Sequence, residues 1–259
     1  MPNRPREKRP SETDIVLKLQ YYACIGWLYR LPLSLMILNF SSKTFLGDNT
    51  WQFRFQPRQH LDWKAGQFIR IEVPHTRPDA LGTVRRFTIA GIPADDAITI
   101  TTRITGTTFK QALFNLRPGS DITLLDPASG DFLWQPSSNP HIYLAQGIGI
   151  TPFYAILKDR RHNELPANAR MYFSTKSDMT ILFKSELLKW AQFDPSLHIT
   201  FQTSPIDPVQ IAQTIPALRN HLVYVSGPKL MLALCLPPIN LPVANLKQDN
   251  FPGYAAGDY

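Results

Sequence analysis

The 259-residue sequence predicts two domains, an antiparallel β-barrel followed by an α/β domain with a parallel sheet, and a helical extension in front of them. Two observations predict this order. Short apolar runs with a two-residue period, separated by Gly, Pro and Asp, indicate antiparallel strands in the first half. Apolar strands then alternate with helix-like stretches, which is typical of a parallel sheet covered by helices. We expect the extension over residues 1–41, the barrel over 42–136 and the α/β domain over 137–259.

The predicted extension joins a basic tail to an apolar, aromatic stretch. Residues 1–14 are polar and rich in Arg and Lys, as expected of a flexible tail. Residues 15–40 are apolar, but Lys18, Arg30 and Pro32 interrupt them, and no uncharged run there reaches the ~20 residues of a spanning helix. We favour a helix packed on the globular body. The alternatives are an interfacial helix, giving a peripheral membrane contact through this stretch, and a membrane span.

Alternating apolar side chains predict the barrel strands. Trp51, Phe53 and Phe55 form one such series, and Ile98 and Ile100 belong to another. Gly, Pro and Asp residues separate the runs and favour turns. The predicted strands are WQFRFQP (51–57), GQFIRIEVP (66–74), VRRFTIAG (84–91), AITITTRI (97–104) and DITLLDP (121–127).

The α/β domain is predicted by apolar runs that alternate with helical spacing. A Pro, Ser and Asn cluster at residues 134–141 marks the boundary in front of it. One helix follows the first strand from Phe153 onward. The other predicted elements are the strands HIYLA (141–145), RMYFST (170–175), LHITFQT (197–203) and HLVYVSG (221–227), and the helices FKSELLKWAQ (183–192) and DPVQIAQTIPAL (207–218).

Composition excludes several classes of site. Two cysteines are too few for a disulfide framework, a cysteine-ligated zinc site or an iron–sulfur cluster. The six histidines lack metal-ligand spacing, so we expect no metal. The net charge of +7 favours an acidic partner, but no nucleic-acid-binding motif accompanies it, and we expect no nucleic acid.

A glycine-rich turn follows the first strand of the α/β domain, in LAQGIGITPFYAIL (144–157). The strand ends at Gly147 and Gly149, and Thr151 and Pro152 are predicted as the N-cap and first residue of a helix. Glycine lets a phosphate approach the backbone, and a helix N-terminus presents free N–H groups. The turn therefore predicts a pyrophosphate site, although the third glycine of a GxGxxG fingerprint is absent.

Two arginines begin the barrel strand at residues 84–91. Arg85 and Arg86, at the rim of a barrel, need an anionic partner, and a planar guanidinium suits phosphate. The ring of the neighbouring Phe87 can stack on a flat heterocycle. This stretch is therefore a second candidate for binding a phosphorylated ligand.

A second glycine turn, RITGTTFKQAL (103–113), connects a strand to a predicted helix. Gly106, Thr107 and Thr108 form the turn, and backbone N–H groups there suit a phosphate.

A fourth motif, VYVSGPKLML (223–232), ends a buried strand of the parallel sheet. Ser226, Gly227 and Pro228 then lie at the carboxyl end of the strand, where open α/β folds bind ligands.

The order and spacing of these four motifs resemble the ferredoxin–NADP reductase superfamily, FAD-dependent NAD(P)H oxidoreductases, over about residues 42–254. The resemblance implies bound FAD. It places Arg85 at the FAD pyrophosphate, Phe87 along the cofactor and the Thr88 hydroxyl at flavin N5. The second phosphate turn of FAD would correspond to Gly106, Thr107 and Thr108.

The resemblance also implies a nicotinamide dinucleotide at residues 147–152 and 226–228. Ser226, which stands where the family usually has cysteine, would orient the nicotinamide. Asp249 and Phe251 match a C-terminal acid-x-aromatic pair; the acid would assist proton balance and the ring would cover the flavin. The expected catalytic residues are therefore Thr88, Ser226, Asp249 and Phe251. Gln146 departs from the family, which commonly has glycine there.

The residues after the second parallel strand bear on the choice of nucleotide. Ser174 and Lys176 stand there without an immediate carboxylate, which suits the 2′-phosphate of NADPH. Asp178 is close by, so NADH stays open.

We therefore expect an oxidoreductase that takes hydride from NAD(P)H onto FAD. Its electrons would pass to an acidic carrier such as a ferredoxin or flavodoxin, or to a small-molecule acceptor. One alternative is the reductase module of a membrane-associated electron-transfer system, and another is an adaptor of the same fold without cofactor. We expect a cytoplasmic location, with the inner face of the membrane as the alternative.

Overall fold

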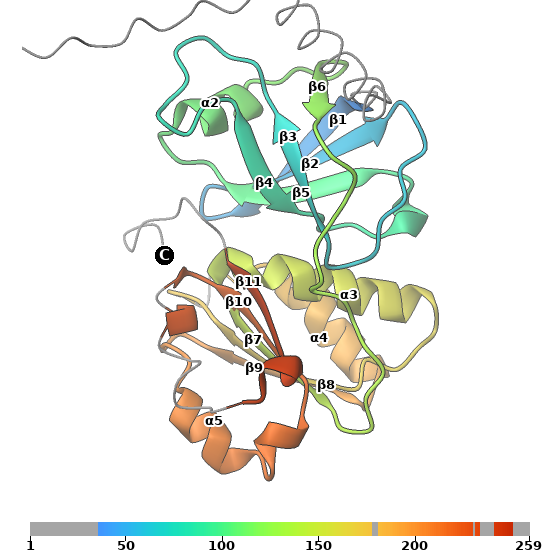
Figure 1. Cartoon of the computed structure of the whole chain (residues 1–259), viewed down its shortest axis with the longest axis vertical. Coiled ribbons are helices and arrows are strands. Elements are labelled where there is room, and N and C mark those ends of the chain that lie inside the picture. Colours follow the sequence, from blue (N-terminus) through green and yellow to red (C-terminus); the bar gives the residue numbers. More distant parts are fainter. Residues whose placement is uncertain (1–35, 178–180, 230, 234–240, 251–259) are drawn as a thin grey trace, which may run out of the picture. The chain divides into compact units, whose positions relative to one another are not determined.

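The computed structural model describes residues 36–177, 181–229, 231–233 and 241–250. These residues form two sheets, an antiparallel one of six strands and a parallel one of five (Figure 1). This arrangement confirms the predicted combination of a β-barrel with an α/β domain. The last strand of the first sheet ends at Leu124 and the first of the second begins at His141, so the predicted boundary falls in the connection.

The antiparallel sheet closes into a barrel around an apolar core. Its strand order is β4-β3-β6-β1-β2-β5, and a bridge between Ile89 and Ile100 joins the two outer strands. Phe53 and Phe55 point into the core, as their alternation predicts. The strands are β1 (Met36–Gly47), β2 (Thr50–Pro57), β3 (Phe68–Glu72), β4 (Val84–Thr88), β5 (Ile98–Arg103) and β6 (Asp121–Leu124), with the short helix η1 (Pro93–Asp95) and helix α2 (Thr108–Phe114) between them.

The first barrel strand begins earlier than the sequence predicts. Residues 36–40, which we assigned to a helical extension, are the start of β1, and Leu38 and Phe40 are buried in the barrel core. The prediction was wrong here because the alternation of Leu38 and Phe40 is hidden in a longer apolar run. Residues 1–35, with the rest of the predicted helix, lie outside the described part of the chain. Within that part, no helix is long and apolar enough to cross a membrane.

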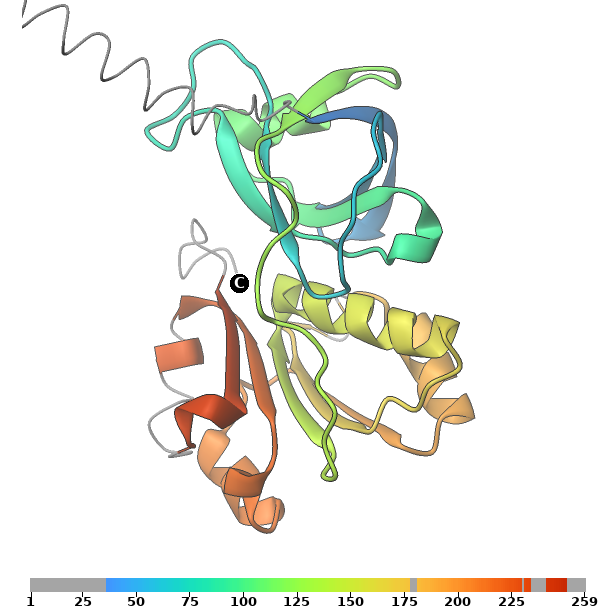
Figure 2. The same cartoon turned by 45° about the vertical axis from the view of Figure 1, so that its right-hand side comes forward.

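Helices cover both faces of the parallel sheet (Figure 2). Along β7, Tyr143 and Ala145 pack toward α3 and α4, whereas Ile142 and Leu144 pack toward α5. The strand order is β11-β10-β7-β8-β9. The elements are β7 (His141–Gln146), the short helix η2 (Gly147–Gly149), α3 (Ile150–His162), β8 (Ala169–Ser174), α4 (Lys184–Phe193), β9 (Leu197–Gln202), α5 (Pro208–Thr214), the short helix η4 (Leu218–Asn220), β10 (Val223–Gly227), the short helix η5 (Val243–Asn245) and β11 (Leu246–Asn250).

Replacing Phe40 by Ala is expected to lower the free energy of unfolding by about 3–5 kcal/mol, because its ring is only 1% exposed in the barrel core. Phe45→Ala is the matched control on the same strand, because that ring is 57% exposed and should cost much less. Urea unfolding of the full chain measures both. Equal losses would show that residues 36–40 do not belong to the barrel.

Candidate functional site

Four strands of the parallel sheet end at one edge and bring the predicted site residues into register. Ser226 on β10 pairs with Ala145 on β7 and with Asp249 on β11. Ser174 on β8 pairs with Gln146. The carboxyl ends of parallel strands are where open α/β sheets bind ligands, so this edge is the candidate site.

The glycine turn after β7 lies directly against β10. Gly147 has φ +55°, in the left-handed region that favours glycine. A Cβ added at Gly149 would lie 2.2 Å from the carbonyl oxygen of Ser226, so a side chain has no room there. Gly147 thus allows the turn, and Gly149 allows its close approach to β10.

Helix α3 begins two residues earlier than predicted. Its N-cap is Gly149, and the Thr151 hydroxyl donates a hydrogen bond to the Ile148 carbonyl at 3.0 Å. The assignment of Thr151 as N-cap and Pro152 as first helical residue was therefore wrong. The reason is that the glycine turn coils as η2 and leads straight into the helix. Pro152 still lies in the first turn, where an N–H has no intrahelical partner.

The Ser226 hydroxyl is buried and unsatisfied. The residue is 0% exposed, and its Oγ has no hydrogen-bond partner within the described residues. The two residues that follow are also buried; a Cβ added at Gly227 would lie 2.7 Å from the Met231 sulfur, and Pro228 is buried. A buried polar atom without a partner is rare enough to require an explanation, and a ligand group is one.

A buried carboxylate joins this edge to the barrel. The Thr88 hydroxyl donates to Asp249 Oδ2 at 3.0 Å, and the Arg86 guanidinium donates to Oδ1. Thr88 and Asp249 are 4% and 5% exposed. Burial raises the pKa of Asp249, and the attraction of Arg86 and the hydrogen bonds from Thr88 and Arg86 lower it only in part, so the net shift is upward.

The predicted cofactor residues on β4 divide between the two faces of that strand. Arg86 and Thr88 face Asp249. Arg85 and Phe87 lie on the other face, where the guanidinium is 4.9 Å and the Phe87 ring 5.9 Å from the Phe109 ring centroid. Phe87 belongs to the buried barrel core. The two-residue period of a strand imposes this division.

The second glycine turn opens α2. Gly106 is exposed, and no atom of the described chain lies within 4 Å of a Cβ added there. Thr107 is the N-cap of α2, and its hydroxyl accepts a hydrogen bond from the Lys110 N–H. The Thr108 hydroxyl accepts a hydrogen bond from the Asp79 N–H at 3.0 Å.

Two residues predicted to bind the 2′-phosphate differ in their surroundings. Ser174 is buried and its hydroxyl donates to the Ser204 carbonyl at 2.6 Å, whereas Lys176 is exposed. Phe251, predicted to cover the flavin, lies outside the described residues. No cluster of metal-binding side chains occurs among the residues that the structure describes.

Part of the α/β domain matches a known family model. Residues 143–235 match the family model of the oxidoreductase NAD-binding domain. The chain is 29% identical over 177 residues to the ferredoxin reductase component of 3-ketosteroid-9-alpha-monooxygenase from Mycolicibacterium smegmatis, covering 65% of this chain and 49% of that protein. It is 24% identical over 144 residues to methane monooxygenase component C from Methylosinus trichosporium, covering 55% of this chain and 41% of that one. The chain thus spans about half the length of the curated relatives it matches.

Solved structures extend the likeness to both sheets. The FAD/NAD-binding domain of nitric oxide dioxygenase from Vibrio cholerae aligns with TM-score 0.69 at 16% identity, covering 83% of this chain and 98% of that one. Ferredoxin-NADP+ reductase from Plasmodium falciparum aligns with TM-score 0.70 at 16% identity, covering 86% and 98%. The chain has the ferredoxin–NADP reductase fold. The fold implied by the resemblance of the four motifs is confirmed.

The ferredoxin–NADP reductase fold implies FAD and a nicotinamide nucleotide, and one residue at the sheet edge and one in the barrel fit such ligands. The orphaned Ser226 hydroxyl offers a polar contact that the described chain leaves unmet. Gly106, which is predicted to form a phosphate turn, has open space around it. Arg85 is the exception, since Asp79 already holds it with hydrogen bonds of 2.7 and 2.9 Å.

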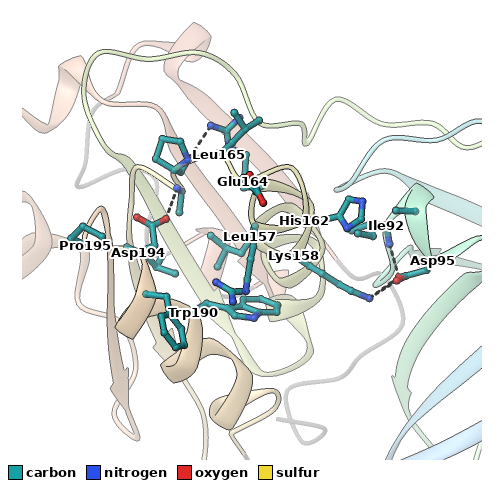
Figure 3. Close-up of a pocket in the computed structure, with 17 residues that line it drawn as sticks. Ile92, Asp95, Leu157, Lys158, His162, Glu164, Leu165, Trp190, Asp194 and Pro195 are labelled. Carbon is teal, nitrogen blue, oxygen red and sulfur yellow. Dashed lines mark hydrogen bonds and ion pairs between the residues drawn. The ribbon is translucent and has the colours of Figure 1, made fainter.

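A cavity of about 790 Å³ is lined by Leu157, Lys158 and His162 of the C-terminal half of α3 (Figure 3). The glycine turn precedes the other end of this helix. On one side, the Lys158 amine pairs with Asp95 of η1 at 2.7 Å, which links α3 to the barrel. Trp190 and Asp194 of the α4 region line it as well. Because it adjoins the C-terminal half of α3, this cavity is separate from the carboxyl edge of the sheet.

The sequence did not reveal which acids contact the two adjacent arginines, Arg85 and Arg86. Asp249 was assigned to proton balance, but its contact with Arg86 was not foreseen. Asp79, which holds Arg85, was not singled out at all. The one available signal was that two adjacent arginines need anionic partners, and the chain itself supplies both.

Gly149→Ala is expected to lower the free energy of unfolding by about 1–3 kcal/mol or more, because the new methyl group overlaps the Ser226 carbonyl. Gly106→Ala is the control, because open space surrounds that position. Urea unfolding of the full chain compares them. A smaller loss for Gly149→Ala than for Gly106→Ala would contradict the packing described here.

The titration of Asp249 predicts a pH dependence. Between the ordinary pKa of 3.8 and its raised value, the folded chain keeps a proton that the unfolded chain has lost. The free energy of unfolding of the wild type should therefore fall, relative to Asp249→Asn, as the pH rises through that interval. Asn does not titrate and can still accept the Thr88 hydrogen bond. Urea unfolding of both proteins at a series of pH values measures the difference, and parallel curves would refute the prediction.

Proposed function

We propose that this chain is an FAD-dependent NAD(P)H oxidoreductase that passes electrons to a partner protein. One observation carries the proposal: the sheet edge with the unsatisfied Ser226 hydroxyl adjoins the barrel strand that bears Thr88 and Arg86, through Asp249. The names of the relatives support it, since one is the ferredoxin reductase component of a monooxygenase and another is component C of methane monooxygenase.

The parallel sheet supplies the nicotinamide side of the proposed reaction. The turn at residues 147–149 brings the backbone close to β10, and backbone N–H groups there suit a diphosphate. Ser226 then has a hydroxyl free to orient the nicotinamide ring. Bound FAD supplies the capacity to accept a hydride and release electrons singly.

The barrel supplies the flavin side. The Thr88 hydroxyl would contact the flavin ring. The Arg85 guanidinium would contact the FAD pyrophosphate. The second phosphate turn of FAD would be formed by Gly106, Thr107 and Thr108. Burial raises the pKa of Asp249, and this carboxyl beside Thr88 is the group proposed to assist proton balance. Arg86 fixes the orientation of that carboxyl. The role of Phe251 as a cover for the flavin stays a prediction.

We propose NADPH as the nucleotide, with Lys176 as its 2′-phosphate contact. Lys176 is exposed after β8, whereas the Ser174 hydroxyl is engaged by the backbone. The proposed acceptor is an acidic redox protein, either an oxygenase component or a ferredoxin or flavodoxin, because the chain carries a net charge of +7.

An anaerobic titration of the FAD-loaded full chain tests this function. NADPH should bleach the flavin absorbance at lower concentration than NADH does. Lys176→Gln should raise the NADPH concentration for half-bleaching about tenfold, equivalent to ~1.4 kcal/mol, and leave NADH unchanged. Lys189→Gln, exposed on α4, is the control. A protein that is colourless after incubation with FAD and removal of the unbound cofactor would instead be an adaptor of this fold.

A further inference from the structure

The loop between β3 and β4, residues 73–83, folds back onto the arginine that follows it. Arg85 Nη2 donates to both oxygens of Asp79, at 2.7 and 2.9 Å. Arg85 Nη1 donates to the carbonyls of Leu81, Gly82 and Val84, at 2.9, 2.9 and 2.8 Å. Both terminal nitrogens of this guanidinium are therefore engaged by the loop and the start of β4.

The surroundings of Arg85 make an anion necessary. Its side chain is 15% exposed, and its guanidinium lies against the Phe109 ring. A charge removed this far from water needs a partner of opposite sign. Burial raises the pKa of Asp79, but the hydrogen bonds from Arg85 and the Leu81 N–H and the attraction of Arg85 and His75 outweigh it, so the pKa lies below its ordinary value. Asp79 is thus ionised at neutral pH.

The backbone of the same residue contacts the turn at residues 106–108, which the proposed function assigns to a phosphate. The Asp79 N–H donates to the Thr108 hydroxyl at 3.0 Å, and His75 Nε2 lies 3.1 Å from that hydroxyl. His75 is held in turn by the Val73 carbonyl, 2.7 Å from its Nδ1. Asp79 therefore contacts both Arg85 and Thr108, two side chains assigned to FAD phosphates in the proposed function.

We propose that Asp79 is an affinity-determining residue for the flavin, whose carboxylate takes the place of the cofactor phosphate on Arg85 and must leave before FAD binds there. This proposal rests on the proposed function. It follows that Asp79 competes only with flavins that carry phosphate. A flavin without phosphate gains nothing from Arg85 and has no reason to displace the carboxylate.

Binding measurements on the full chain test the competition. Asp79→Asn should bind FAD about tenfold more tightly than the wild type, because Asn removes the competing charge. Arg85→Gln should bind FAD more weakly, and in that background Asp79→Asn should no longer tighten binding. Riboflavin, which has no phosphate, should bind the wild type and Asp79→Asn equally. Asp126→Asn, which breaks an Arg–Asp pair with Arg70 elsewhere on the barrel, is the matched control and should leave FAD binding unchanged.

A second readout needs no cofactor. Leu81 is exposed in the loop, and chymotrypsin should cut after it faster in ligand-free Asp79→Asn than in the wild type, because the loop has lost its ion pair. Equal cutting of the two proteins would overturn the role of Asp79 in holding the loop.

The outcomes separate this proposal from the function on which it rests. Normal binding of FAD by the wild type, with no gain in Asp79→Asn, would overturn the competition and leave the proposed function standing. Failure of every variant to bind FAD would overturn both. A gain in riboflavin binding as large as the gain in FAD binding would show that Asp79 controls loop access and not the phosphate contact, and would also overturn the proposal.

Discussion

The contact of Asp249 with Thr88 and Arg86 is the interaction on which the arrangement of the site depends. It joins β11 of the parallel sheet to β4 of the barrel, and its carboxylate is nearly sealed from water. Among the described residues, Lys158 of α3 also pairs with Asp95 of η1, with side chains 32% and 20% exposed. Lys247 of β11 pairs with Asp131 of the connection between the sheets, but Asp131 is 84% exposed, and exposed pairs contribute little. A buried carboxylate that loses its hydrogen-bond partners is strongly destabilising. This contact therefore favours the alignment of β4 and β11 in which Thr88 and Arg86 both reach Asp249.

The alternation of β4 decides which residues face the parallel sheet. Because successive side chains point to opposite faces, Arg86 and Thr88 meet Asp249, while Arg85 meets the loop at residues 73–83. The side chains of β4 therefore contact two separate acids, Asp249 and Asp79. The charge of each arginine is balanced within the chain, which explains how two adjacent guanidinium groups are tolerated at a barrel rim.

Local sequence patterns predicted most of the fold. The features that could not be predicted depend on contacts between residues far apart in the sequence. The strands with apolar alternation and the glycine turn after β7 were found because their cause lies within a few residues. Strand β11 was missed because LKQDN has no apolar period; its extended form comes from pairing with β10. Asp79 was missed for a similar reason. Nothing in the local sequence indicates that this loop carboxylate pairs with Arg85, because the pair forms only when the loop folds back.

The close approach of Gly149 to β10 has a mechanical consequence. Backbone atoms of the turn and of Ser226 and Gly227 are in direct contact, with no side chain between them to yield. A shift of the turn is therefore passed to β10, and the ladder between β10 and β11 carries it on to Asp249. A ligand bound at this turn would in this way be coupled through the backbone to Asp249 at the sheet edge.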